Sequence, residues 1–122
     1  MSTTGGELGF LQLCADRRFH RVIMEAFEQA AGLAPDGYWI EAIVGGAPGQ
    51  ALRSRAADFA RSKGATQLAW SAHGDACGGF PDTPNERLRE MLERTVERRR
   101  VEYPDATHYV FFATERRIER LA

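Results

Sequence analysis

The sequence predicts an α/β fold: a four-stranded, mostly parallel sheet flanked by helices. Short runs of apolar, aromatic and β-branched residues alternate with segments whose apolar residues recur at helical spacing. The resulting order, strand-helix-strand-helix-strand-helix-strand, is typical of parallel strands joined by right-handed helical crossovers. No repeat, linker or low-complexity segment divides the 122 residues, so we expect a single domain over residues 1–122.

The first half of the chain contains two predicted strands around one helix. Residues 8–13 form a short, mostly apolar run, as expected of a strand covered on both faces. Apolar residues then recur every three or four positions over residues 19–30, which indicates an amphipathic helix, and Gly32 is a natural stop for it. Residues 38–44 are rich in aromatic and β-branched types, so we expect a second strand there.

A glycine-rich loop at residues 45–49 leads into the next helix and strand. Residues 52–60 place apolar side chains on one helix face and charged side chains on the other, and Gly64 follows as a stop. Residues 66–72 then read as a third strand, which delivers His73 at its carboxyl end.

The last part of the chain predicts one long helix, a fourth strand and a terminal helical turn. Thr83 can cap a helix whose first residue is Pro84, and Pro104 ends it. Residues 107–113 have the composition of a strand, and residues 116–121 fit a short helical turn.

Composition narrows the functional classes. The net charge is −1, with 27% charged and 43% hydrophobic residues, as in an ordinary soluble globule, and there is no basic stripe for nucleic acid. No apolar run approaches the roughly 20 residues of a membrane span, and the N-terminus does not resemble a signal peptide. We therefore expect a cytoplasmic protein. In a reducing compartment, its two cysteines are more typical of ligands or free thiols than of a disulfide.

Two short motifs carry the chemistry. Cys14, Asp16 and Arg18 follow the first predicted strand, and His73 and Cys77 follow the third. Because carboxyl ends of parallel strands meet at one edge of a sheet, these residues can share a crevice although about 60 positions separate them. Two thiolates and a neutral imidazole make a three-ligand zinc set whose fourth position stays open to water, as in catalytic zinc sites.

The motifs resemble those of the β-class carbonic anhydrases, which read Cys-x-Asp-x-Arg and His-x-x-Cys. The first motif matches at Cys14, Asp16 and Arg18, whereas in the second three residues, not two, separate His73 from Cys77. The resemblance implies a carbonic-anhydrase-like fold and a zinc lyase that converts carbon dioxide reversibly to bicarbonate. It also implies a homodimer, a Zn²⁺ ion held by Cys14, His73 and Cys77, and a catalytic Asp16 that Arg18 holds in place.

The shifted second motif leaves alternatives open. We expect Cys77 to be the third ligand, because the glycines Gly74, Gly78 and Gly79 make the loop permissive enough to absorb one extra residue. Asp75 is the competing ligand, or an acceptor for an imidazole N–H. At the level of function, the alternatives are a catalytically silent binding or assembly module and a hydrolase of a related heterocumulene such as carbonyl sulfide.

Overall fold

The computed structural model describes residues 7–50 and 52–122. Strands and helices alternate along these residues, as the sequence predicts. The elements are β1 Leu8–Cys14, the 3₁₀ turn η1 Arg17–Phe19, α1 His20–Ala31, β2 Tyr38–Ile43, the 3₁₀ turn η2 Ala47–Gly49, α2 Arg55–Ser62, β3 Ala65–His73, α3 Asn85–Glu102, β4 Thr107–Ala113 and β5 Ile118–Arg120.

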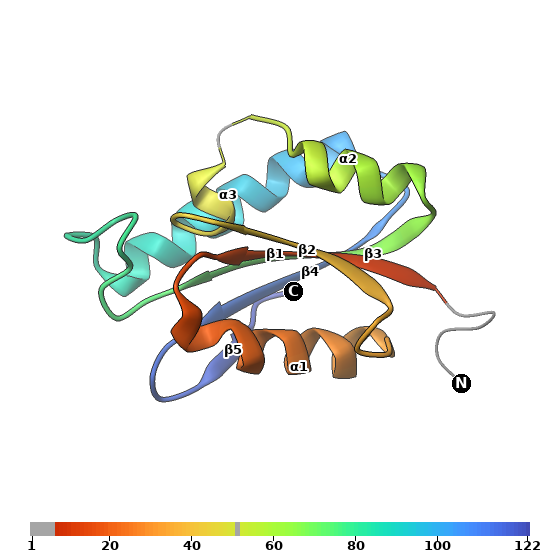
Figure 1. Cartoon of the computed structure of the whole chain (residues 1–122). Coiled ribbons are helices and arrows are strands. Elements are labelled where there is room, and N and C mark those ends of the chain that lie inside the picture. The colour runs from red at the N-terminus through yellow and green to blue at the C-terminus, as the bar shows by residue number, and fades with distance from the viewer. Residues whose placement is uncertain (1–6, 51) are drawn as a thin grey trace.

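The strands form one twisted sheet in the order β2-β1-β3-β4-β5. The first four strands are parallel, and only β5 runs antiparallel, to β4. Figure 1 shows α1 on one face of the sheet and α2 and α3 on the other. The predicted α/β class and the mostly parallel sheet are therefore confirmed.

The predicted count of four strands and the predicted helical turn at residues 116–121 are wrong. Ile118–Arg120 form β5, which pairs with β4 from Phe111 to Ala113. A tight turn joins the two strands, closed by the Thr114 N–H donating to the Arg117 carbonyl at 2.9 Å. The reversal covers the outer edge of β4, whose backbone groups would otherwise lack partners, so a short segment gains more from pairing than from one helical turn.

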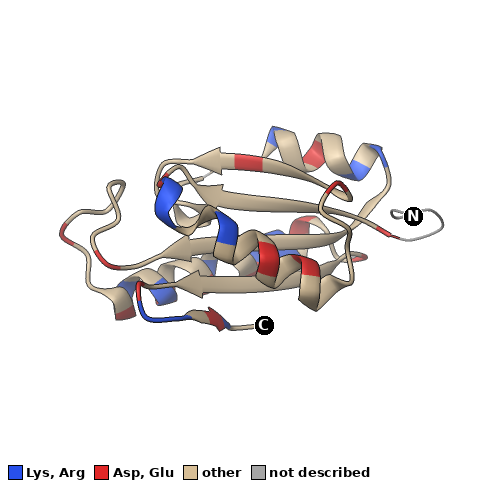
Figure 2. Ribbon diagram, turned by 60° about the horizontal axis from the view of Figure 1, so that its bottom comes forward, with Lys and Arg blue, Asp and Glu red and all other residues tan. Residues whose placement is uncertain are grey.

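Each sheet face has its own apolar core. Leu68, Trp70 and Ala72 of β3 pack towards α2 and α3, whereas Ala69 packs towards α1 with Phe27. Charged residues of both signs lie mainly on the helices and loops, and the inner strands are almost free of them (Figure 2). Among the described helices, none combines the length and the apolar character needed to cross a bilayer.

Two predicted helix ends have different outcomes. Gly32 ends α1 with φ 68°, and its N–H donates to the Glu28 carbonyl, as expected for a glycine stop. The predicted cap at Thr83 is wrong, because α3 begins at Asn85 with Pro84 in the cap position and no side-chain cap. This shift leaves the Asn85 side chain available for the loop that follows β3.

Candidate metal centre

The structure brings Cys14, His73 and Cys77 together at the carboxyl edge of the sheet. Cys14 is the last residue of β1, His73 is the last residue of the neighbouring strand β3, and Cys77 lies in the loop after it. The two sulfurs are 3.9 Å apart, and one ligand atom from each residue lies within 4.8 Å of the others. All three residues are buried. The expectation that they meet is confirmed, and together they can hold a metal ion.

The imidazole of His73 is oriented for ligation. Its Nδ1 lies 2.7 Å from the Gly74 carbonyl oxygen, which can only accept, so Nδ1 carries the proton and Nε2 presents a lone pair. Nε2 is buried, and none of the described residues gives it a hydrogen-bond partner. A buried polar atom without a partner is costly unless something binds it, and metal-ligating histidines are typically fixed through their other nitrogen in this way.

The separation of the two thiols fits a tetrahedral ion. Two sulfurs about 2.3 Å from one zinc ion, at a tetrahedral angle, stand about 3.8 Å apart. Cys14 and Cys77 are free thiols with their sulfurs 3.9 Å apart, which is within the range that a shared ion requires and too long for a disulfide. The chemistry of the three donors and the spacing of the two sulfurs therefore fit zinc.

Local electrostatics favour a thiolate at Cys14. Burial raises the pKa of its thiol, but the nearby His73 imidazole and the backbone amides of Asp16 and Gly45 more than offset this, and the pKa falls to about 7. Burial lowers the pKa of His73, while Cys14 and the Gly74 carbonyl raise it, with a net upward direction. A cation bound between the two side chains would favour the Cys14 thiolate and accept the Nε2 lone pair of His73.

Asp16 and Arg18 form a two-pronged ion pair beside the three ligands. Arg18 donates from Nε to both carboxylate oxygens at 3.1 and 3.0 Å and from Nη2 to Oδ2 at 2.8 Å. Its backbone N–H also donates to Asp16 Oδ1 at 2.9 Å. These bonds hold the pKa of Asp16 at about 2, so the carboxylate is ionised at any physiological pH. Asp16 Oδ2 lies 3.6 Å from His73 Nε2, so the carboxylate is adjacent to the ligand set.

Neighbouring side chains brace this arrangement. Phe19 is buried and stacks on the His73 ring, with centroids 4.6 Å apart and planes at 25°. The Arg18 guanidinium lies over the Phe19 ring at 5.0 Å and reaches Glu115 at 3.5 Å. The imidazole is therefore held on one face by an apolar ring, which also keeps water from that face.

The extra residue of the second motif is absorbed differently from the prediction. None of the loop glycines has a positive φ; instead Asp75 and Ala76 do, at 56° and 67°. Gly74 and Gly79 serve close approach, because a Cβ on them would overlap Asn85 and the backbone of Gly45. The glycine explanation is thus wrong in mechanism, although the loop does bring Cys77 to the other ligands.

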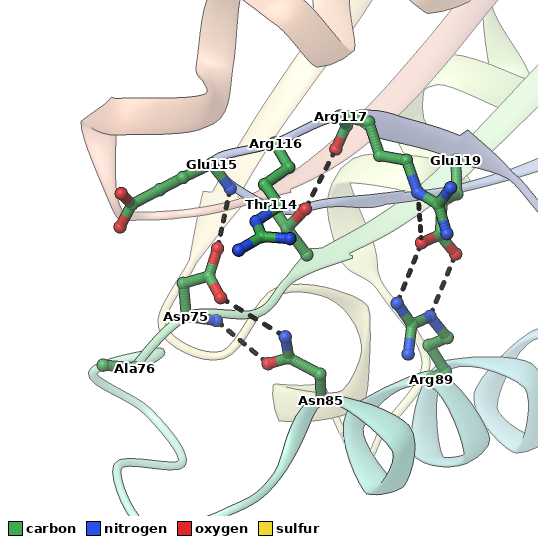
Figure 3. A pocket seen from close by; sticks show the side chains of 9 residues that line it. All are labelled: Asp75, Ala76, Asn85, Arg89, Thr114, Glu115, Arg116, Arg117 and Glu119. Atoms are coloured by element: carbon green, nitrogen blue, oxygen red, sulfur yellow. Dashed lines mark hydrogen bonds and ion pairs between the residues drawn. The ribbon is translucent and has the colours of Figure 1, made fainter.

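Asp75 is not among the clustered ligands. Its carboxylate accepts hydrogen bonds from the backbone N–H of Glu115 at 2.7 Å and from Asn85 Nδ2 at 3.3 Å. The predicted role as acceptor for the imidazole is filled by the Gly74 carbonyl. Asp75 lines a cavity of about 1060 Å³ whose walls come from α3 and the turn before β5 (Figure 3).

Sequence reasoning overlooked two side chains of this centre. The sequence pattern places Phe19 only on a helix face, and nothing local indicates that it stacks on an imidazole 54 positions away. Asn85 follows a proline at a helix start, where a short amide side chain often binds neighbouring backbone, and that signal could have drawn attention to it.

No family model matches the chain, and comparisons with curated proteins and with solved structures gave no match either. The residues of the centre therefore carry the functional interpretation.

Proposed function

We propose that this chain is a zinc-dependent lyase that hydrates carbon dioxide reversibly to bicarbonate, in the manner of the β-class carbonic anhydrases. The observation that carries the proposal is the buried cluster of Cys14, His73 and Cys77, in which one ligand atom from each residue lies within 4.8 Å of the others. Cys14, His73 and Cys77 would hold the ion. When bound, zinc supplies a Lewis acid that lowers the pKa of a water molecule from 15.7 to about 7.

Asp16 and Arg18 would act on the reacting water. Asp16 remains ionised and can only accept, so a water beside the ligand set would donate a hydrogen bond to Oδ2 and could then direct a lone pair towards carbon dioxide. Arg18 removes the rotational freedom of that carboxylate through its fork. Phe19 limits water on the other face of the imidazole.

The proposal is tested by metal content and by rate. Protein expressed with ample zinc should carry about one zinc ion per chain. Stopped-flow hydration of carbon dioxide should be faster than with the Cys14→Ser variant, which removes one ligand. An Arg21→Ala variant serves as a surface control, because Arg21 is exposed and pairs with the exposed Glu25. A wild-type rate no higher than that of Cys14→Ser would refute the proposed enzymatic activity.

A catalytically silent binding or assembly module is the second candidate. One observation favours it: Cys14, His73 and Cys77 are at most 6% exposed, so little of the ligand set reaches the surface. Absence of zinc after zinc-replete expression, together with a background hydration rate, would favour this module over the enzyme.

The same centre suits related heterocumulenes such as carbonyl sulfide, which is also linear and has an electrophilic central carbon. Parallel assays with carbon dioxide and carbonyl sulfide on one preparation separate the two substrates. A higher specific rate with carbonyl sulfide would identify carbonyl sulfide as the preferred substrate, and the proposed residue roles would stay the same.

We also propose a homodimer. Within the described residues β2 pairs only with β1, so its outer edge has no strand partner. Ile40, Val44 and Phe59 near this edge are 46%, 66% and 52% exposed, which is apolar surface that a second copy can cover. Light scattering should give a dimer mass, and a monomer at every concentration would rule it out.

A further inference from the structure

The loop between His73 and Cys77 is held in an unfavourable backbone conformation. Asp75 and Ala76 have φ of 56° and 67°, in the left-handed region of backbone conformation that residues other than glycine rarely adopt. Aspartate tolerates this region better than alanine, because its short carboxylate can bond to nearby backbone. Two such residues in succession persist only where surrounding contacts fix them. They immediately precede Cys77, so whatever fixes them also fixes the third sulfur.

Contacts from two distant elements fix Asp75. Its N–H donates to Asn85 Oδ1 at 3.0 Å, and its carboxylate accepts from Asn85 Nδ2 at 3.3 Å and from the Glu115 N–H at 2.7 Å. Figure 3 shows the carboxylate between Asn85 on α3 and Glu115 on the turn before β5. Gly74 leaves the space that the Asn85 amide occupies. The residue is therefore clamped from both sides.

The backbone of Asp75 also reaches the other half of the centre. Its carbonyl oxygen accepts from Arg18 Nη2 at 3.3 Å, the same nitrogen that binds Asp16 Oδ2 at 2.8 Å. The loop that carries Cys77 and the carboxylate of Asp16 are thus joined through one guanidinium. A shift of Asp75 would therefore displace both the loop that carries Cys77 and the carboxylate of Asp16.

We infer that Asp75 is a positioning residue: its clamp by Asn85 and Glu115 sets where the Cys77 sulfur meets the metal, and its carbonyl, through Arg18, sets the orientation of Asp16. This inference rests on the proposed metal site.

The test is titration of the full chain with Co²⁺, whose thiolate charge-transfer band reports how many sulfurs bind. The variants are Asp75→Ala, Asp75→Asn and Asn85→Ala, with Asp82→Ala, an exposed aspartate of the same loop, as the matched control. We expect Asp75→Ala and Asn85→Ala to bind Co²⁺ about 10–100-fold more weakly, the usual effect of losing an outer contact. Their band per bound ion should drop to about half, as one of two thiolates leaves. Asp75→Asn, which keeps one of the two carboxylate contacts, should lose less Co²⁺ affinity. Asp82→Ala should match the wild type in both affinity and band intensity.

The outcomes separate this inference from the proposal on which it rests. If the wild-type chain binds no Co²⁺, the proposed metal site itself is refuted. Wild-type chain with a two-thiolate spectrum, and Asp75→Ala with the same affinity and spectrum, would overturn the positioning role alone. Melting temperatures of the metal-free proteins are measured in parallel. Variants that melt lower yet keep the wild-type band per bound ion would show a merely structural role and also overturn it. If Asp75→Ala does not fold, Asn85→Ala gives the same decision.

Discussion

Replacing Cys77 with serine removes one sulfur from the centre and should abolish most of the stabilisation that zinc gives. The wild-type sulfurs are already 3.9 Å apart, near the spacing of a tetrahedral site, so binding requires little rearrangement. Free zinc at about 100 times Kd adds about 2.7 kcal/mol to the free energy of unfolding. For a chain of 122 residues, 1 kcal/mol corresponds to roughly 4 °C in Tm, so zinc should raise the wild-type Tm by about 10 °C.

At the same zinc concentration, a site weakened about 100-fold retains about 0.4 kcal/mol, which is less than 2 °C. Scanning calorimetry with zinc, against a baseline with chelator, should show this collapse for Cys77→Ser. Asp75→Asn should keep more than half of the wild-type shift, because its side chain is directed to Asn85 and Glu115. A full zinc shift in Cys77→Ser together with its disappearance in Asp75→Asn would refute the ligand assignment.

Three further predictions concern the scaffold. Gly46→Ala should lower the free energy of unfolding, measured by chemical denaturation, by about 3 kcal/mol or more. Gly46 has φ 67° and ψ −154°, and a Cβ would lie 2.5 Å from the Ser71 carbonyl oxygen. A decrease below about 1 kcal/mol would contradict this. Arg99→Met should lower the free energy of unfolding by about 2–3 kcal/mol in the same measurement, because the buried guanidinium donates to two loop carbonyls and to the Glu102 carboxylate. An unchanged free energy of unfolding would show that these contacts make no net contribution to stability. Burial lowers the pKa of His108 below 6.5, and Trp70 donates to its Nδ1, so the folded chain takes up a proton there less readily than the unfolded chain. The free energy of unfolding should therefore fall as pH drops below about 6.5, and the His108→Gln variant should lose part of that dependence; equal slopes in both proteins would disprove it.

Local sequence determined most of the architecture. The composition of residues 107–113 predicts a strand that coincides with β4, Thr107–Ala113, because aromatic and β-branched side chains suit a pleated, buried surface wherever they occur. Gly32 marks the end of α1 for an equally local reason, since it adopts φ 68° without a side-chain penalty. The strand ends at Cys14 and His73 then follow from the pattern, and the parallel order brings these two residues to one edge.

Only the tertiary structure decided the third ligand and the last strand. β5 is three residues long, too short for a local signal, and exists because β4 offers an edge to pair with. Cys77 reaches the other ligands through left-handed residues at Asp75 and Ala76, a conformation that local preference disfavours. Asn85 and the 114–117 turn hold that conformation from positions 10 and 40 residues away. Sequence patterns report the local preferences of the backbone, whereas a strained loop is fixed by contacts between distant residues, so the motif alone could name Cys77 but could not place it.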